Sequence, residues 1–143
     1  MEFLTLFDAA NPGACYRRTA SVRPQQALAL ANSDLALMQG RLLAHKLWQR
    51  SVDGTATPSA AALSSFVSRA FARCLSRSPS DEELVASLAF LERQTTLFVS
   101  VGDAALAAPK DAGAVPAATE PAARARESFT QALFSHADFV TVR

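Results

Sequence analysis

Apolar residues recur at intervals of three and four positions through most of the chain, and this spacing predicts helices rather than strands. The clearest example begins after Pro58 and continues to about residue 77. Its apolar positions form one stripe: Leu63, Phe66, Val67, Ala70, Phe71, Cys74 and Leu75. A stripe of this width is typical of a helix that packs one face against a core. Ser59 is the expected N-cap, because its side-chain oxygen can accept from a free backbone N–H of the first turn.

A second helix is expected over residues 81–100, within the segment that begins SPSDEEL. Ser80 and Glu83 have the spacing of a capping box, in which each side chain bonds the backbone N–H of the other residue. Its inward-facing positions are predicted to be Leu84, Leu88, Leu91 and Phe98. Because the intervening turn is short, we expect residues 60–100 to form a helical hairpin.

Two more helices are expected before this hairpin and one after it. The first starts at Pro24, which suits a first helical turn because its missing N–H is not needed there. The next is capped by Ser33 or Asp34 and runs to about residue 50, with four core candidates: Leu35, Met38, Leu42 and Leu43. The last spans about residues 120–135. The sequence therefore predicts an all-α fold of about five helices.

Two segments lack a periodic apolar face. Residues 52–58 combine Gly, Pro and Thr, which is typical of a linker between helices. Residues 102–119 are rich in Ala, Gly and Pro, and we expect them to form one long flexible loop. The chain has 143 residues and no internal repeat, so its simplest organisation is a single helical domain over residues 1–143.

The composition is that of a globular protein, with 50% apolar and 19% charged residues. A net charge of +1 gives the chain no strong attraction to nucleic acid or to anionic lipid. No uninterrupted apolar run reaches the roughly 18 residues of a membrane span, so no span is expected. The first residues do not resemble a secretory signal, because Glu2 stands where a basic region is usual.

The residues that could carry chemistry gather in the window 7–32, FDAANPGACYRRTASVRPQQALALAN. The candidate cluster consists of Asp8, Asn11, Cys15, Arg18, Ser21, Gln26 and Asn32. Asp8 and Arg18 could be a charged pair that lines a pocket, with Cys15 as a nucleophile. The same side chains could instead brace a loop through bonds to their own backbone and cap the helices that follow. The window holds no histidine or second carboxylate to activate the cysteine, which favours bracing and a non-enzymatic role.

Other candidate sites are weak. The two histidines, His45 and His136, lack the three or four convergent ligands of a metal site, so no metal is expected. The chain has no Cys-x-x-Cys-His motif for attaching c-type haem, and no cofactor is expected in it. Arg69, Arg73 and Arg77 form a row on one helix. Without a wider basic patch, this row is interpreted as a solvated face rather than a nucleic-acid site.

Three stretches together resemble a known bacterial family. FDAANPGACYRR, followed by Ser21 and RPQQALALAN, is similar to its Phe-Asp-x-Pro-Asn-Pro loop and its Pro-Leu-Gln-Ala-Leu helix start. LSRSPSDEELVASLAFLERQ resembles its Gly-Arg-Pro-Pro-Thr-x-x-Glu-Glu-Leu hairpin, and FTQALFSHADFVTVR its closing Gln-Ala-Leu-Leu-Asn-Ser-Asn-Glu-Phe segment. The family is the C-terminal domain of large planctomycetal cytochrome-c-associated proteins (domain of unknown function fifteen fifty-three). The chain departs from the pattern at several positions: Ala10, Val22, Gln25 and residues 135–137.

The resemblance implies that the chain is the C-terminal part of a larger, exported domain. Its function would then be that of a non-catalytic helical scaffold or interaction module. The alternative is an accessory part of an enzyme in redox or polysaccharide-breakdown chemistry, with a pocket at the Asp8/Arg18 loop. The expected partner is the upstream region of a longer parent protein or a second copy, through the apolar first residues: Phe3, Leu4, Leu6 and Phe7.

Overall fold

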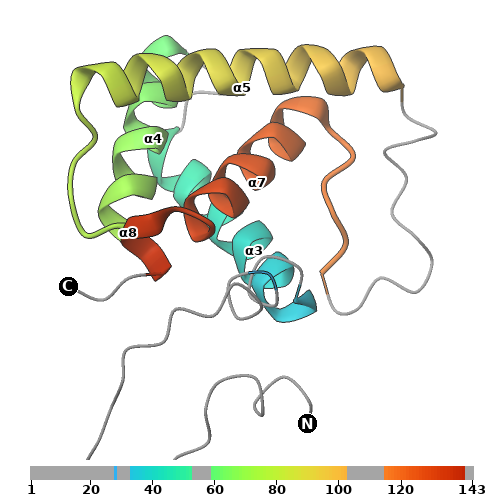
Figure 1. Cartoon of the computed structure of the whole chain (residues 1–143). Helices are drawn as coiled ribbons and strands as arrows, with labels where there is room; N and C mark the ends of the chain where they lie inside the picture. The colour runs from blue at the N-terminus through green and yellow to red at the C-terminus, as the bar shows by residue number, and fades with distance from the viewer. Residues whose placement is uncertain (1–27, 29–32, 53–58, 103–114, 141–143) are drawn as a thin grey trace, which may run out of the picture.

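The computed structural model describes residue 28 and residues 33–52, 59–102 and 115–140 (Figure 1). These residues form helices and contain no strand, which confirms the all-α prediction for the part of the chain that is described. The helices, in order, are α3 (Asp34–Ser51), α4 (Ala60–Cys74), α5 (Asp81–Val101), α7 (Pro121–Phe134) and the short α8 (Ala137–Val140). Of the helix expected from Pro24, only Leu28 is described, and it is helical and exposed.

Helix α7 lies at the centre of the described fold. It packs most extensively against α5 and α3, and it also contacts α4 and α8. Helix α5 runs across one end of the other helices, at the top of the view in Figure 1. Residues 75–80 join α4 to α5; the two helices contact each other and cross in this view.

Serine caps begin three of the helices, as the sequence predicts. Ser33 accepts a hydrogen bond from the backbone N–H of Ala36 at 3.1 Å, and Ser59 accepts one from Ala62 at 3.1 Å. Ser80 and Glu83 form the full capping box of α5, with distances of 2.8 and 3.2 Å. Each bond satisfies a backbone donor that the helix itself leaves free.

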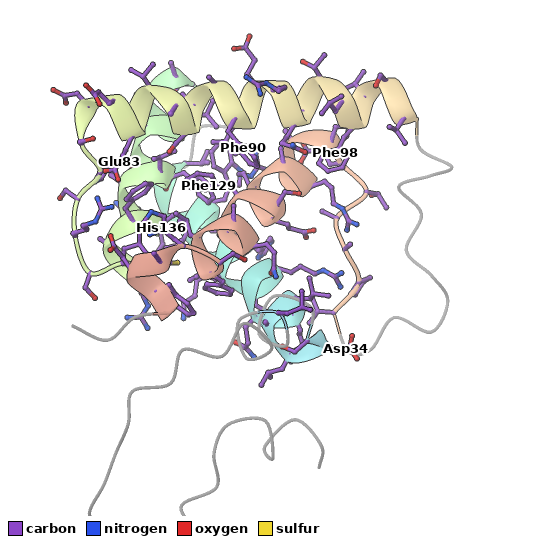
Figure 2. All side chains as sticks on the ribbon, viewed as in Figure 1. Asp34, Glu83, Phe90, Phe98, Phe129 and His136 are labelled. Atoms are coloured by element: carbon purple, nitrogen blue, oxygen red, sulfur yellow. The ribbon has the colours of Figure 1, made fainter. Side chains whose placement is uncertain are left out.

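The core lies between α4, α7 and the inner face of α5. The predicted stripe of α4 is confirmed, with five of its residues buried and the side chains of Leu63 and Cys74 packed against them. The ring of Phe129 on α7 lies 6.1 Å from that of Phe66 and 6.0 Å from that of Phe90 on α5. Figure 2 shows Phe90 and Phe129 in the space between α5 and α7. These aromatic contacts hold the three helices to one another.

The buried face of α3 differs from the one predicted. The sequence places Leu35 and Leu42 in the core, but their side chains are 56% and 45% exposed. Met38 is half-buried, and Leu43 packs against the core from its edge. The residues that α3 buries are mostly small: Gly40, Ala44, Leu47 and Ser51.

Close contact with α7 explains this choice. The hydroxyl of Thr130 on α7 lies 3.0 Å from the carbonyl oxygen of Gly40, to which it can donate. A Cβ atom at Gly40 would lie 3.4 Å from Oε1 of Gln131 and 3.5 Å from Phe134. Leucine at this position would not fit, so the face that meets α7 is selected by size rather than by hydrophobicity.

Helix α5 buries only Ser87 and Leu91 completely, although it has 21 residues. Three other predicted inward positions, Leu84, Leu88 and Phe98, are partly buried and pack against the core, which confirms the direction of this face. The helix also exposes four aliphatic residues: Val85, Leu97, Val99 and Val101.

By length and composition alone, α5 is the one helix among the described residues that could cross a membrane. Its apolar character is interrupted by the adjacent charges Glu92 and Arg93. It also packs along α7 as part of the helical domain. A peripheral helix of a folded domain can meet the same criterion, so this finding describes the helix and does not place it in a membrane.

The end of the predicted flexible loop is packed against α7 and α3. Ala117 is buried, and the backbone N–H of Ala118 donates to the carboxylate of Glu127 at 3.0 Å. Arg41 on α3 donates to the carbonyl of Val115 at 2.8 Å. Residues 103–114 of the expected loop lie outside the described residues, so flexibility stays a prediction for that part.

Candidate functional site

The seven residues of the predicted polar cluster lie outside the described residues: Asp8, Asn11, Cys15, Arg18, Ser21, Gln26 and Asn32. The expected pair between Asp8 and Arg18, and the choice between a pocket and a braced loop, therefore stay predictions. The charged groups that the described residues bring together come from other parts of the sequence.

The most connected of these groups is the guanidinium of Arg77, in the turn after α4. Its two terminal nitrogens donate to the two carboxylate oxygens of Glu83, each at 2.7 Å. Its Nε donates to Asp138 of α8 at 3.2 Å, and its Cζ lies 5.4 Å from the ring centroid of Phe71. A planar guanidinium suits such a two-oxygen contact, because its donors are fixed in a fork.

We call Arg77, Glu83 and Asp138 the Arg77 cluster. Each of the three is placed by a helix or by the turn that follows a helix. Ser76 adopts a left-handed backbone with φ of 56°, which ends α4 and turns the chain toward Arg77. Glu83 stands in the first turn of α5 because it also bonds the backbone N–H of Ser80. Asp138 is brought to the same place by α8. Figure 2 labels Glu83 and His136, which is two residues before Asp138, and both lie toward the left of the view.

The contact between Arg77 and Glu83 fixes the charged state of both groups. The hydrogen bonds from Arg77, followed by that from the Ser80 backbone, lower the pKa of Glu83 to about 2. The bond to Glu83 also raises the pKa of Arg77 above its ordinary value. Both groups are therefore charged throughout the neutral range and neither can exchange a proton there, so the cluster suits a structural clasp better than acid–base catalysis.

His136 takes part in the adjacent turn. Its Nδ1 accepts a hydrogen bond from the backbone N–H of Asp138 at 3.1 Å, which caps the start of α8. The same nitrogen lies 3.8 Å from the carboxylate of Asp138, a pair that is ionic only when the ring is protonated. Within the part of the chain that is described, no three His, Cys, Asp or Glu side chains converge as metal ligands.

A second arginine is buried between α7 and α3. The guanidinium of Arg126 lies 4.0 Å from the ring centroid of Trp48 and 3.4 Å from the carboxylate of Glu120. Burial lowers the pKa of Arg126, and the nearby Glu120 opposes this shift. The contact with the aromatic ring compensates part of the lost hydration of the cation.

Cys74, the cysteine that the described residues include, is not poised for nucleophilic attack. Its side chain packs at the edge of the core, and burial raises the pKa of its thiol to about 11. The neighbouring Arg73 opposes this shift but does not overcome it. At neutral pH the residue therefore remains a thiol, the weakly nucleophilic form.

A concavity of about 780 Å³ lies along the outer side of α3, which sequence reasoning did not find. Its lining includes three leucines, Leu42, Leu43 and Leu47, and three basic side chains, Lys46, Arg50 and Arg73. The remaining lining residues are Gln39, His45 and Gln49. No ion pair among the described residues involves the three cations. The surface thus combines apolar and basic side chains; we call the three leucines its floor and the three basic residues its rim.

The sequence contains signals for part of this arrangement. The spacing Arg77, Ser80, Glu83 is visible in the chain, and the serine and glutamate form the capping box that it predicts. The interpretation of the arginine row as solvated is wrong for Arg77, because its donors bind Glu83 and Asp138. Asp138 is 61 positions from Arg77, and no local pattern joins residues so far apart.

The family model described as PSD1, a protein of unknown function (DUF1553), matches residues 1–91, which is more than half of the chain. The chain belongs to this family. The matched residues run from the predicted polar cluster through α3 and α4 into α5. Neither the curated proteins nor the solved structures include a match to the chain.

Within this PSD1 chain, the Arg77 cluster joins two of the stretches that carry the resemblance. Arg77 and Glu83 belong to the segment that resembles the family's Arg-Pro-Pro-Thr-x-x-Glu motif. Asp138 belongs to the closing segment of the predicted resemblance, beyond the residues that the family model matches. The two stretches are therefore in direct contact through an ion pair.

Proposed function

We propose that this PSD1 chain is a non-catalytic helical scaffold, an interaction module of a larger exported bacterial protein of the planctomycetal, cytochrome-c-associated type. The observation that carries the proposal is the surface of α5. This helix is the longest of those described, yet it exposes Val85, Leu97, Val99 and Val101. Exposed aliphatic side chains that recur along one helix offer apolar area for another protein surface to cover.

The state of the charged groups supports a scaffold. Arg77, Glu83 and Asp138 form a clasp between elements, and Arg126 pairs with Glu120 beneath Trp48. The half-buried Cys74 remains a neutral thiol. These groups contribute to stability through fixed bonds, whereas a catalytic group needs a pKa near the working pH and access to a substrate.

The proposed partner of the α5 surface is the upstream region of a longer parent protein. A titration of this chain with that region, produced as a separate polypeptide and followed by calorimetry, tests the idea. Replacing Val85 and Val99 with Glu places two charges in the contact and should weaken binding at least about tenfold, since each buried aliphatic side chain contributes roughly 1.5–3 kcal/mol. The matched control is R93Q, which changes an exposed polar position of the same helix. Equal affinities for all variants would overturn the proposed surface.

The enzymatic alternative, with a pocket at the Asp8/Arg18 loop, stays a prediction because that loop lies outside the described residues. The second expected partner, another copy of the chain that binds through Phe3, Leu4, Leu6 and Phe7, also stays a prediction, because these residues lie outside the described part of the chain.

A further inference from the structure

The concavity along α3 has the shape and chemistry of a site for a short peptide segment. Its volume of about 780 Å³ lies within the usual range for occupied sites, about 300–1,000 Å³. Leu42 in its lining is 45% exposed, whereas Leu43 and Leu47 in the same lining belong to the core or pack against it. An apolar floor of this kind gains free energy when another apolar surface covers it.

The rim specifies the charge of the occupant. Lys46, Arg50 and Arg73 lie along the concavity, and none of the described residues that line it is acidic. The ion pairs among the described residues use other cations: Arg77, Arg124 and Arg126. An apolar segment with acidic residues at its ends would therefore match both the floor and the rim.

The first residues of the chain have this composition. The segment MEFLTLFD carries four large apolar residues between Glu2 and Asp8, and the first basic side chain follows only at Arg17. Phe3, Phe7 and the leucines between them share one side if the segment is helical, because they lie three and four positions apart.

The connection to α3 is long enough for this contact. Residues 9–32 separate the segment from Ser33, the N-cap of α3. These 24 residues span up to about 80 Å when extended and about 36 Å when helical. From Ser33 to Leu42 along α3 the distance is about 14 Å, so either conformation reaches. The family match over residues 1–91 also includes the segment and every residue that lines the concavity.

We propose that residues 2–8 of this chain dock into the concavity along α3, with Phe3, Leu4, Leu6 and Phe7 over Leu42 and with Glu2 and Asp8 facing Lys46, Arg50 and Arg73. The contact is intramolecular. It covers the apolar start of the chain without a second copy, and it leaves the outer side of α5 as the surface for a partner.

Paramagnetic relaxation in the full chain tests the contact. A nitroxide label is attached to the thiol that the substitution Leu6→Cys introduces, in a background with Cys15→Ser. Cys74 is retained, because its half-buried thiol has a pKa of about 11 and reacts slowly at neutral pH. The label should broaden the backbone amide signals of residues 39–50 and leave those of Val85 and Leu97 unchanged.

Two controls separate this contact from the alternatives. A label attached through Glu82→Cys, on the exposed first turn of α5, should leave residues 39–50 unaffected. A mixture of labelled unenriched chain with unlabelled ¹⁵N chain reports contacts between copies. Broadening of residues 39–50 in the mixture as strong as in the single labelled chain would assign the concavity to a second copy and overturn the proposal. The absence of broadening at α3 in either sample would overturn it as well.

Charge reversal tests the role of the rim. The double substitution K46E/R73E should lower the ratio of docked to undocked chain about three- to tenfold, the value expected for two exposed ion pairs. Reversal of the segment with Glu2→Lys and Asp8→Lys should restore docking in that background, while R93E on α5 should have no effect. If K46E/R73E does not fold, K46Q/R73Q provides the same test with a smaller change. Docking that is equal in every charge variant would overturn the assignment of the rim.

Discussion

Helices α4 and α5 follow one another in the chain, yet they are held in place by different interactions. Helix α4 buries five of its 15 residues completely, including Phe66 and Val67. Helix α5 has 21 residues and buries two. It packs along α7 through partly buried side chains such as Leu88 and Phe98, and it is anchored to the turn after α4 by the bonds that Arg77 donates to Glu83.

This difference shows that apolar content does not by itself determine burial. The amino acids of α5 are apolar enough to meet the composition of a membrane helix, whereas α4 contains three serines and two arginines. Helix α4 is buried because its apolar residues share one side, which faces α3, α5 and α7. Apolar residues of α5 are distributed around the helix, so some of them must face outward.

The largest expected effect comes from the centre of α4. Replacing Phe66 with Ala removes a fully buried ring that contacts Trp48 at 6.2 Å and Phe129 at 6.1 Å between ring centroids. The free energy of unfolding should fall by about 3–5 kcal/mol. The matched change on α5, Leu97→Ala, should alter it by no more than about 0.5 kcal/mol, because Leu97 is 49% exposed. Urea unfolding followed by circular dichroism compares the two, and similar losses would contradict the distinction.

The segment that follows α5 provides a second comparison. Replacing residues 103–114 with a Gly/Ser linker of equal length should leave the melting temperature nearly unchanged. Extending the replacement to residues 115–118 should cost about 2 kcal/mol, because it removes the buried Ala117 side chain and makes the packed backbone more flexible. Differential scanning calorimetry of both variants measures the difference. A large loss in the first variant would show that residues 103–114 also contribute to packing.

A third comparison concerns the contact between α3 and α7, where small residues meet. Gly40→Ala should raise the free energy of unfolding by about 0.5–1 kcal/mol, since the nearest atoms to the added Cβ lie at 3.4 Å or beyond. Gly40→Leu should lower it by about 1–3 kcal/mol, because the larger side chain overpacks the contact. Chemical denaturation measures the free energy of unfolding of both variants. It shows whether stability rises with alanine and falls with leucine, or changes in the same direction with both. Only the first pattern agrees with a limit of size at this position.

The smallest expected effect is the pH dependence of the α5 anchor. The folded-state pKa of Glu83 is about 2, below its ordinary value of 4.5, so its contribution is complete above pH 4.5 and is lost as the pH falls toward 2. Glu83→Gln should reduce the fall in melting temperature across this window while the capping geometry persists. Glu82→Gln, one residue earlier in the same turn, is the control. If the melting temperature of the Glu83→Gln variant falls as steeply between pH 4.5 and 2 as that of the original chain, the charge of Glu83 does not help to hold α5 in place.

Local features of the fold were predictable because they depend on residues close together in the sequence. The serine caps of α3 and α4, the capping box of α5 and the stripe of α4 each lie within a few turns of one helix. Hydrogen bonds between positions three apart and stripes of period 3.6 depend on backbone geometry alone. The family could also be identified from three short stretches of sequence.

The tertiary structure decided which surfaces meet. Helix α3 turns the side with Gly40 inward rather than the positions of Leu35 and Leu42, because α7 approaches Gly40 closely and leaves little room for a larger side chain there. The partners of Arg77 and Arg126, and the concavity along α3, likewise depend on residues from different helices. The predicted cluster at Asp8 and Arg18 lies outside the described residues. Contacts between residues that are distant in the sequence depend on the shapes of both packed surfaces. A periodic pattern in one helix describes only one of these surfaces and not the helix that packs against it.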